Sequence, residues 1–148
     1  MTEFSFRLET VMKLRKVERD QSRAALAQAV DSLERIEQRI DVINAELRAL
    51  AQAQPAGRAA VDVERALWSN RYAISLRQGR ERCEHDHHAQ SAVVTARREE
   101  LAVADQEFRK LEILRDRRQA QFFAADQQRQ QRAMDEIATQ AVGRNRGD

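Results

Sequence analysis

The chain has 148 residues, enough for one domain, and 42% of them are apolar although only 5% are aromatic. Charged residues make up 34% of the chain, but 26 cations against 24 anions leave a formal net charge of only +2. This composition is typical of a coiled coil and argues against a globular α/β enzyme. No block of like charge forms a polybasic arm.

The helix-breaking residues are concentrated at one point of the sequence. Pro55 is the only proline, and Gly57 follows it closely, whereas both flanks read as continuous helix. This pattern predicts an all-α fold, an antiparallel two-helix coiled-coil hairpin whose second helix is the longer one. Thr2 and Ser5 are candidate N-caps of the first helix, and Asp62 of the second. The predicted single domain consists of helix 1 at about residues 4–52, a connector at 53–61, helix 2 at 62–142 and a frayed tail at 143–148.

Apolar residues at spacings of three and four predict the seam between the helices. Two successive steps of three between Val30 and Ile36 resemble a stammer. Helix 2 contains two heptad rows, one at 94, 101, 108, 115 and 122 and one at 76, 83, 90, 97, 104, 111, 118 and 125. The predicted stripe of helix 1 is Leu8, Val11, Leu14, Val17, Leu26, Val30, Leu33, Ile36, Ile40, Ile43, Leu47 and Leu50.

A chain that folds back at Pro55 has a defined register. Leu47 then lies near Leu67, and Phe4 lies near Leu111, so helix 2 has no partner from helix 1 after about Leu114. Because that unpaired part contains exposed aromatic residues, it is a candidate interaction site. The alternatives are a shifted register or a dimer, either of which covers these residues.

No motif in the sequence predicts catalysis, a cofactor or a metal. Cys83 is the only cysteine, so no intramolecular disulfide can form. Cys83 and His87 share a helix face, as do Glu84 and His88, but structural zinc needs four ligands, usually from two elements. The arginines of the second half of helix 2 are diluted by acidic residues, which argues against nucleic acid as a partner.

The sequence also lacks the features that direct a protein into a membrane. The N-terminus has no basic region followed by an apolar one. No run approaches the ~20 apolar residues that span a bilayer, so no direct membrane insertion is expected. The predicted location is the cytoplasm.

Three segments resemble the flagellar export protein family FliJ. They are FRLETVMKLRKVE at residues 6–18, KLEILRDRR at 110–118 and MDEIA at 134–138. Their order and spacing extend the resemblance over nearly the whole chain. The resemblance implies a non-enzymatic stalk and adaptor of the flagellar type III export apparatus, peripheral to the inner membrane. The implied partners are the hexameric export ATPase, the cytoplasmic domain of the export gate protein and export chaperones.

Two alternatives remain open at this stage. The first is the equivalent stalk of a virulence-type III secretion system, which has the same architecture. The second is an Arg-rich helical nucleic-acid-binding protein, which salt-dependent retention on DNA would reveal.

Two partner sites are predicted on helix 2. Aromatic residues and arginines are enriched at interface hot spots, which points to an ATPase-binding site formed by Phe122 and Phe123 and framed by Arg115, Arg118 and Arg129. A second strip recurs on one helix face and is the predicted gate-binding site. The alternative for this strip is packing against helix 1. Its members are Tyr72, Leu76, Gly79 and Cys83.

Overall fold

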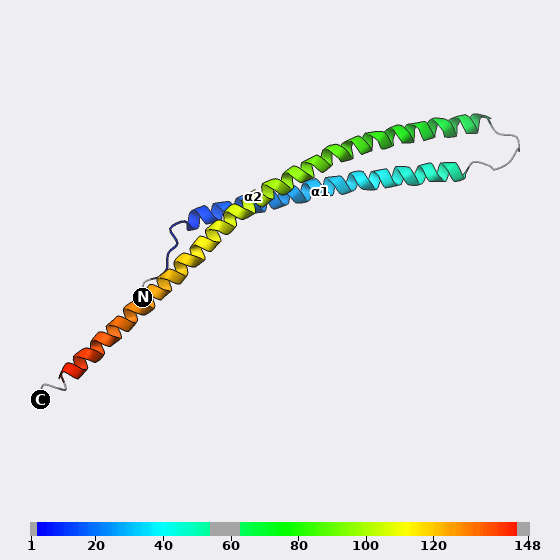
Figure 1. Ribbon diagram of the computed structural model, residues 1–148. Coiled ribbons are helices and arrows are strands. Elements are labelled where there is room, and N and C mark those ends of the chain that lie inside the picture. The colour runs from blue at the N-terminus through cyan, green and yellow to red at the C-terminus, as the bar shows by residue number, and fades with distance from the viewer. Residues whose placement is uncertain (1–2, 54–62, 145–148) are drawn as a thin grey trace. The chain divides into compact units, whose positions relative to one another are not determined.

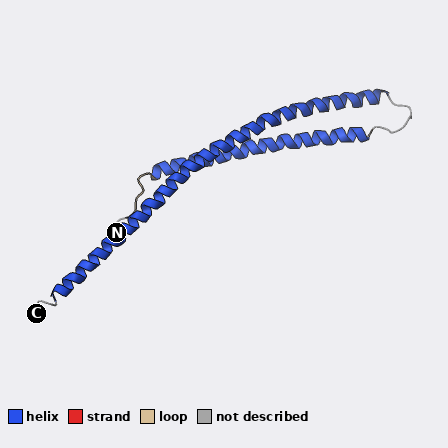
Figure 2. Cartoon of the chain, in the orientation of Figure 1, coloured by secondary structure: helices blue, strands red, loops and turns tan. Residues whose placement is uncertain are grey.

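The computed structural model describes residues 3–53 and 63–144. Two helices, α1 (Glu9–Gln52) and α2 (Val63–Arg144), account for nearly all of these residues, and no strand occurs among them (Figures 1 and 2). The predicted all-helical fold, with two packed helices of which the second is longer, is confirmed. The predicted connector and the Asp62 cap lie outside the described residues, apart from Ala53.

The chain divides into two compact units. Unit 1 comprises Met1–Arg19 and Val103–Asp148, and unit 2 comprises Asp20–Ala102. Each unit therefore contains a part of α1 and a part of α2. The expectation of a single domain stays a prediction.

The first helix begins later than predicted. Residues 3–6 are not helical, and residues 7 and 8 form a turn in which Glu9 N donates to Phe6 O at 3.0 Å. Ser5 therefore does not cap α1, and Thr2 lies outside the described residues. Glu9 in the first turn complements the positive end of the helix dipole.

The seam of α1 follows an unbroken heptad pattern. The steps alternate between four and three along the whole helix, and no seam residue is exposed. Because the seam passes through Ala29 rather than Val30, the predicted stammer is absent. The seam positions are Leu8, Met12, Arg15, Arg19, Ser22, Leu26, Ala29, Leu33, Ile36, Ile40, Ile43, Leu47 and Leu50.

This seam differs from the predicted stripe at the start of α1. Val11, Leu14 and Val17 are exposed, and Arg15 and Arg19 lie at the seam instead. The prediction was wrong here because it followed hydrophobicity. A long arginine side chain can bury its stem and keep its charged head paired at the edge of the seam.

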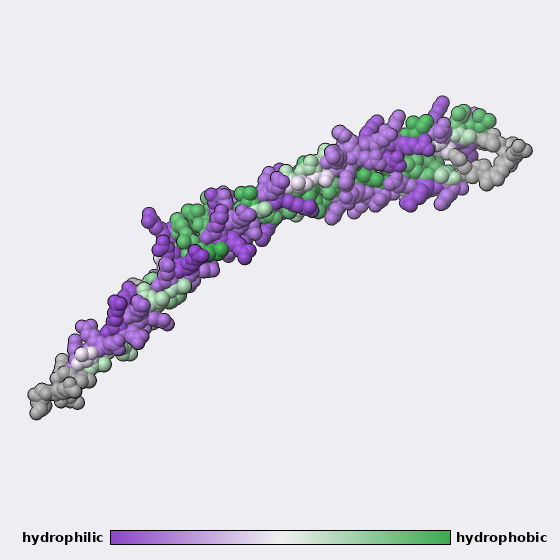
Figure 3. Space-filling view, viewed as in Figure 1, coloured by the Kyte–Doolittle hydropathy of each residue, from purple (hydrophilic) through white to green (hydrophobic). Residues whose placement is uncertain are grey.

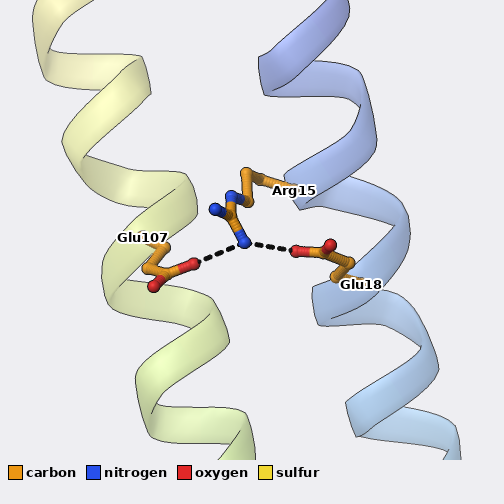
Figure 4. A network of polar contacts seen from close by, with 3 residues as sticks. All are labelled: Arg15, Glu18 and Glu107. Carbon is orange, nitrogen blue, oxygen red and sulfur yellow. Dashed lines mark hydrogen bonds and ion pairs between the residues drawn. The ribbon is translucent and has the colours of Figure 1, made fainter.

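The contacts in unit 1 explain why arginine is tolerated at these positions. Arg15 Nη1 lies 2.8 Å from Glu18 Oε2 and 2.7 Å from Glu107 Oε2 of α2 (Figure 4). The hydrogen bond to Glu18 and the charges of both carboxylates raise the pKa of Arg15 above its ordinary value. At the next seam position, Arg19 Cζ lies 4.3 Å from the centre of the Phe108 ring, which is a cation–π contact.

The seam of α2 agrees better with the prediction than the seam of α1 does. The predicted row at 94, 101, 108, 115 and 122 is buried or half-buried throughout, and it extends back to residues 73, 80 and 87. In the second predicted row, positions 97, 118 and 125 are exposed, whereas the other members are buried or half-buried. The buried apolar residues among those described are Met12, Ala29, Cys83, Val94 and Phe108.

The register of the pair differs from the predicted one. Glu46 pairs with Tyr72 in unit 2, where the prediction places Trp68, and Phe4 contacts Phe122 in unit 1 instead of Leu111. In unit 2 the residue of α2 that meets Glu46 lies further along the chain than predicted, and the first turns of α2 are exposed. In unit 1 the non-helical segment around Phe4 advances by up to ~3.3 Å per residue, instead of ~1.5 Å in a helix.

Polar residues occupy the middle of the seam in unit 2. Gln90 Nε2 donates to Ala29 O at 3.0 Å, and His87 Nε2 lies 2.9 Å from Glu37 Oε1. Arg80 Nε is buried without a hydrogen-bond partner and forms an ion pair with Glu84 Oε1 at 3.2 Å. Gln90 and His87 are therefore held by specific partners on α1.

Candidate partner-binding sites

The predicted ATPase-binding residues lie in an aromatic cluster of unit 1. The rings of Phe4 and Phe122 are 5.7 Å apart at 55°, and those of Phe122 and Phe123 are 5.8 Å apart at 74°. Both geometries are favourable for aromatic pairs. Phe122 is half-buried, so the prediction that it has no partner was wrong, whereas Phe123 is 53% exposed.

The N-terminal segment forms an open groove beside this cluster. The groove has a volume of about 480 Å³ and is lined by Phe4, Ser5, Phe6, Glu9, Arg115 and Gln119. Phe4 was not among the predicted ATPase-binding residues, because the assumed register placed it near Leu111. The alternation of aromatic and polar residues from Glu3 to Arg7, which is typical of extended chain, was the available signal.

The three predicted arginines differ in their surroundings. Arg115 Nη2 and Arg129 Nη2 each lie 3.2 Å from a neighbouring aspartate, Asp116 and Asp126 respectively. Arg118 is exposed. The pairing reduces the local positive charge, which weakens the case for a nucleic-acid surface.

The predicted gate-binding strip is divided by the structure. Cys83 is 8% exposed in the seam, and Leu76 and Gly79 are half-buried. A Cβ atom at Gly79 would lie 3.8 Å from Ile43 Cδ1, so Gly79 faces α1. Tyr72 is the member with an exposed side chain.

Tyr72 is part of a small polar and aromatic group in unit 2. Its hydroxyl donates to Glu46 Oε2 at 2.9 Å, and its ring stacks on Trp68 at 5.3 Å with an interplanar angle of 20°. The hydrogen bond to Glu46, and then the charge of that carboxylate, raise the pKa of Tyr72 above its ordinary value. Glu46 was missed because the predicted register placed it opposite Trp68 rather than Tyr72. The stacking of Trp68 on Tyr72 was available from the sequence, since residues four apart are neighbours on a helix.

The family model of the flagellar FliJ protein matches residues 4–147, nearly the whole chain. The chain belongs to the FliJ family. It is therefore a component of the flagellar export apparatus. No curated protein and no solved structure matches the chain.

The part of this FliJ-family chain beyond Phe122 has its own apolar face. The α2 seam row continues from Phe122 to Arg129 and Glu136, which are polar. Phe123, Met134 and Ile137 are exposed and lie within about 60° of one another around α2. The last turns of α2 therefore do not continue the seam.

The described residues of this FliJ-family chain were searched for metal-binding groups and for membrane-spanning stretches. Within residues 3–53 and 63–144, no group of three or more His, Cys, Asp or Glu side chains is placed to hold a metal ion. Neither described helix contains a stretch long and apolar enough to cross a membrane.

Gly79→Ala is expected to stabilise the protein. The new methyl group meets Ile43 at an ordinary contact distance of 3.8 Å, and Gly79 has no positive φ. Alanine is favoured over glycine in a helix interior by about 1 kcal/mol. Urea denaturation followed by circular dichroism should show a gain of this size, and a loss of stability would mean that the helices approach more closely at this point than the structure has them.

Titration of Tyr72 tests the bond to Glu46. Because the folded-state pKa is raised, the bond stabilises the fold below the ordinary pKa of 10.0 and is lost as the pH rises through the folded value. Tyr72 is the only tyrosine, so the absorbance of tyrosinate reports on it alone. Glu46→Ala should shift the titration to lower pH; an unchanged curve would show that the bond is absent in solution.

Proposed function

We propose that the chain is a non-enzymatic stalk and adaptor of the export apparatus that binds the hexameric export ATPase and the export gate and assists export chaperones. The observation that carries this proposal is the aromatic cluster of unit 1, with Phe123 exposed, in a chain of the FliJ family. No cofactor takes part. The chain acts in the cytoplasm at the inner-membrane export apparatus.

The ATPase-binding site consists of Phe123 as the anchor, with Arg118 and Arg129 beside it. An exposed aromatic ring flanked by arginines is a typical hot-spot combination. Phe122 and Arg115 contribute indirectly, because Phe122 holds Phe4 and Arg115 lines the adjoining groove.

The gate-binding site centres on Tyr72. Leu76, Gly79 and Cys83 pack toward α1 and hold this part of α2 in place, so Tyr72 is the member that reaches a partner. The stacked ring of Trp68 enlarges the apolar surface, and tyrosine and tryptophan are both frequent at interfaces.

Reciprocal binding measurements test the two sites. Phe123→Ala should weaken binding to the purified ATPase by about tenfold or more and leave binding to the cytoplasmic gate domain unchanged. Tyr72→Ala should weaken binding to the cytoplasmic gate domain and leave binding to the ATPase unchanged. These single variants are cleaner than changing Phe122 or Leu76, which contact other parts of the fold. If both variants bind both partners as the wild type does, the assignment of the sites is wrong.

A further inference from the structure

The start of α1 places apolar and charged residues in the reverse of the usual order. Arg15 and Arg19 occupy the seam of unit 1, while Val11 and Leu14 in the same turns are 42% and 56% exposed. An apolar residue normally takes the seam and an arginine the surface. Departures of this kind are expected where a second surface has to be kept apolar.

The contacts of Arg15 show on which flank these residues lie. Arg15 bridges Glu18 of α1 and Glu107 of α2, which places both glutamates on one side of the helix pair (Figure 4). Val11 lies one heptad before Glu18, and Leu114 lies one heptad after Glu107. Because residues a heptad apart share a face, Val11 and Leu114 flank the seam on that same side.

Together these residues form an apolar strip along one flank of unit 1. Val11 and Leu14 provide its α1 side, and Leu114, which is 36% exposed, provides its α2 side. Figure 3 shows hydrophobic surface along the start of α1. The glutamates at the next heptad share Arg15, so that one guanidinium offsets one of their two negative charges.

The α2 edge of this strip is positively charged. Lys110 and Arg117 are exposed and lie four residues before and three residues after Leu114, which puts them on the same face of α2. An amphipathic helix can bind such a strip by laying its own apolar face on it. The two cations favour a helix that carries acidic residues along one edge of its apolar face.

We propose that this flank of unit 1 binds an amphipathic helix of another protein, with an apolar stripe on Val11, Leu14 and Leu114 and acidic residues facing Lys110 and Arg117. A second copy of the chain is a poorer occupant, since a two-fold arrangement brings the two cationic edges together. This surface is distinct from Phe123 and from Tyr72.

Two synthetic helical peptides test the proposal with the full-length chain. Both carry the same leucine stripe, one with glutamate margins and the other with lysine margins. We expect the glutamate peptide to bind at least about tenfold more tightly in fluorescence anisotropy, and Leu14→Gln to weaken it by about tenfold. Ile74→Gln, at an exposed apolar residue of unit 2, is the matched control and should bind like the wild type.

Charge reversal gives a second, independent readout. The double change Lys110→Glu and Arg117→Glu should reverse the preference between the two peptides. Because Leu14 is exposed, Leu14→Gln should keep the helicity of the wild type. The proposal is overturned if neither peptide binds, if Leu14→Gln binds equally well or loses helicity, or if sedimentation shows a dimer that Leu14→Gln dissociates.

Discussion

Phe108→Ala is expected to lower the free energy of unfolding by about 3–4 kcal/mol. Phe108 is 7% exposed, and the guanidinium of Arg19 lies over its ring. Truncation removes the largest buried apolar side chain among the described residues and leaves Arg19 over a void. Since few residues of this helix pair are buried, such a loss is a large share of a typical total stability of about 5–15 kcal/mol.

The control for this variant is the same substitution at Phe123. Phe123 is also on α2 in unit 1, but it is exposed. Urea denaturation of Phe123→Ala should therefore give a free energy of unfolding close to that of the wild type. Equal losses in the two variants would contradict the assignment of Phe108 to the seam.

Ala29→Leu is expected to lower the free energy of unfolding by about 1–3 kcal/mol, although leucine is the more hydrophobic residue. Ala29 is buried in the seam of unit 2, and its carbonyl oxygen accepts the hydrogen bond from Gln90. A larger side chain pushes α2 away at this point and separates Gln90 from that oxygen. A half-buried Gln90 without its partner adds to the loss.

Ala27→Leu provides the matched comparison on the same helix. Ala27 is exposed, and leucine is nearly as good a helix former as alanine. Thermal unfolding of Ala27→Leu should occur close to the wild-type temperature. If Ala29→Leu is instead more stable than the wild type, the seam does not pass through Ala29.

The sequence predicts the fold class because long-range periodicity is a strong signal. The row from Val94 to Phe122 was identified correctly, since its apolar members recur every seven residues. The seam at the start of α1 was not identified, because two arginines, Arg15 and Arg19, follow Met12 at its seam positions. Hydrophobicity alone cannot indicate that Glu107 and Phe108, distant in sequence, will accommodate Arg15 and Arg19.

The register is harder to predict than the pattern. A heptad repeat looks the same when it is shifted by seven residues, so the position of the turn decides which residues meet. The assumption of a symmetric turn at Pro55 put Phe4 opposite Leu111 instead of Phe122. The candidate sites follow the same rule: Phe123 and Tyr72 were found from their residue type, whereas the places of Phe4 and Glu46 depended on the register.

Steady-state ATP hydrolysis by the purified export ATPase of the same organism, measured with increasing amounts of the chain, tests the proposed adaptor function most directly. We predict a saturable rise in the hydrolysis rate with the wild type, and a rise displaced to at least about tenfold higher concentration with Phe123→Ala. Trp68→Ala, which changes an exposed aromatic residue of unit 2, should stimulate like the wild type. A hydrolysis rate that does not change with the folded wild-type chain would contradict the account.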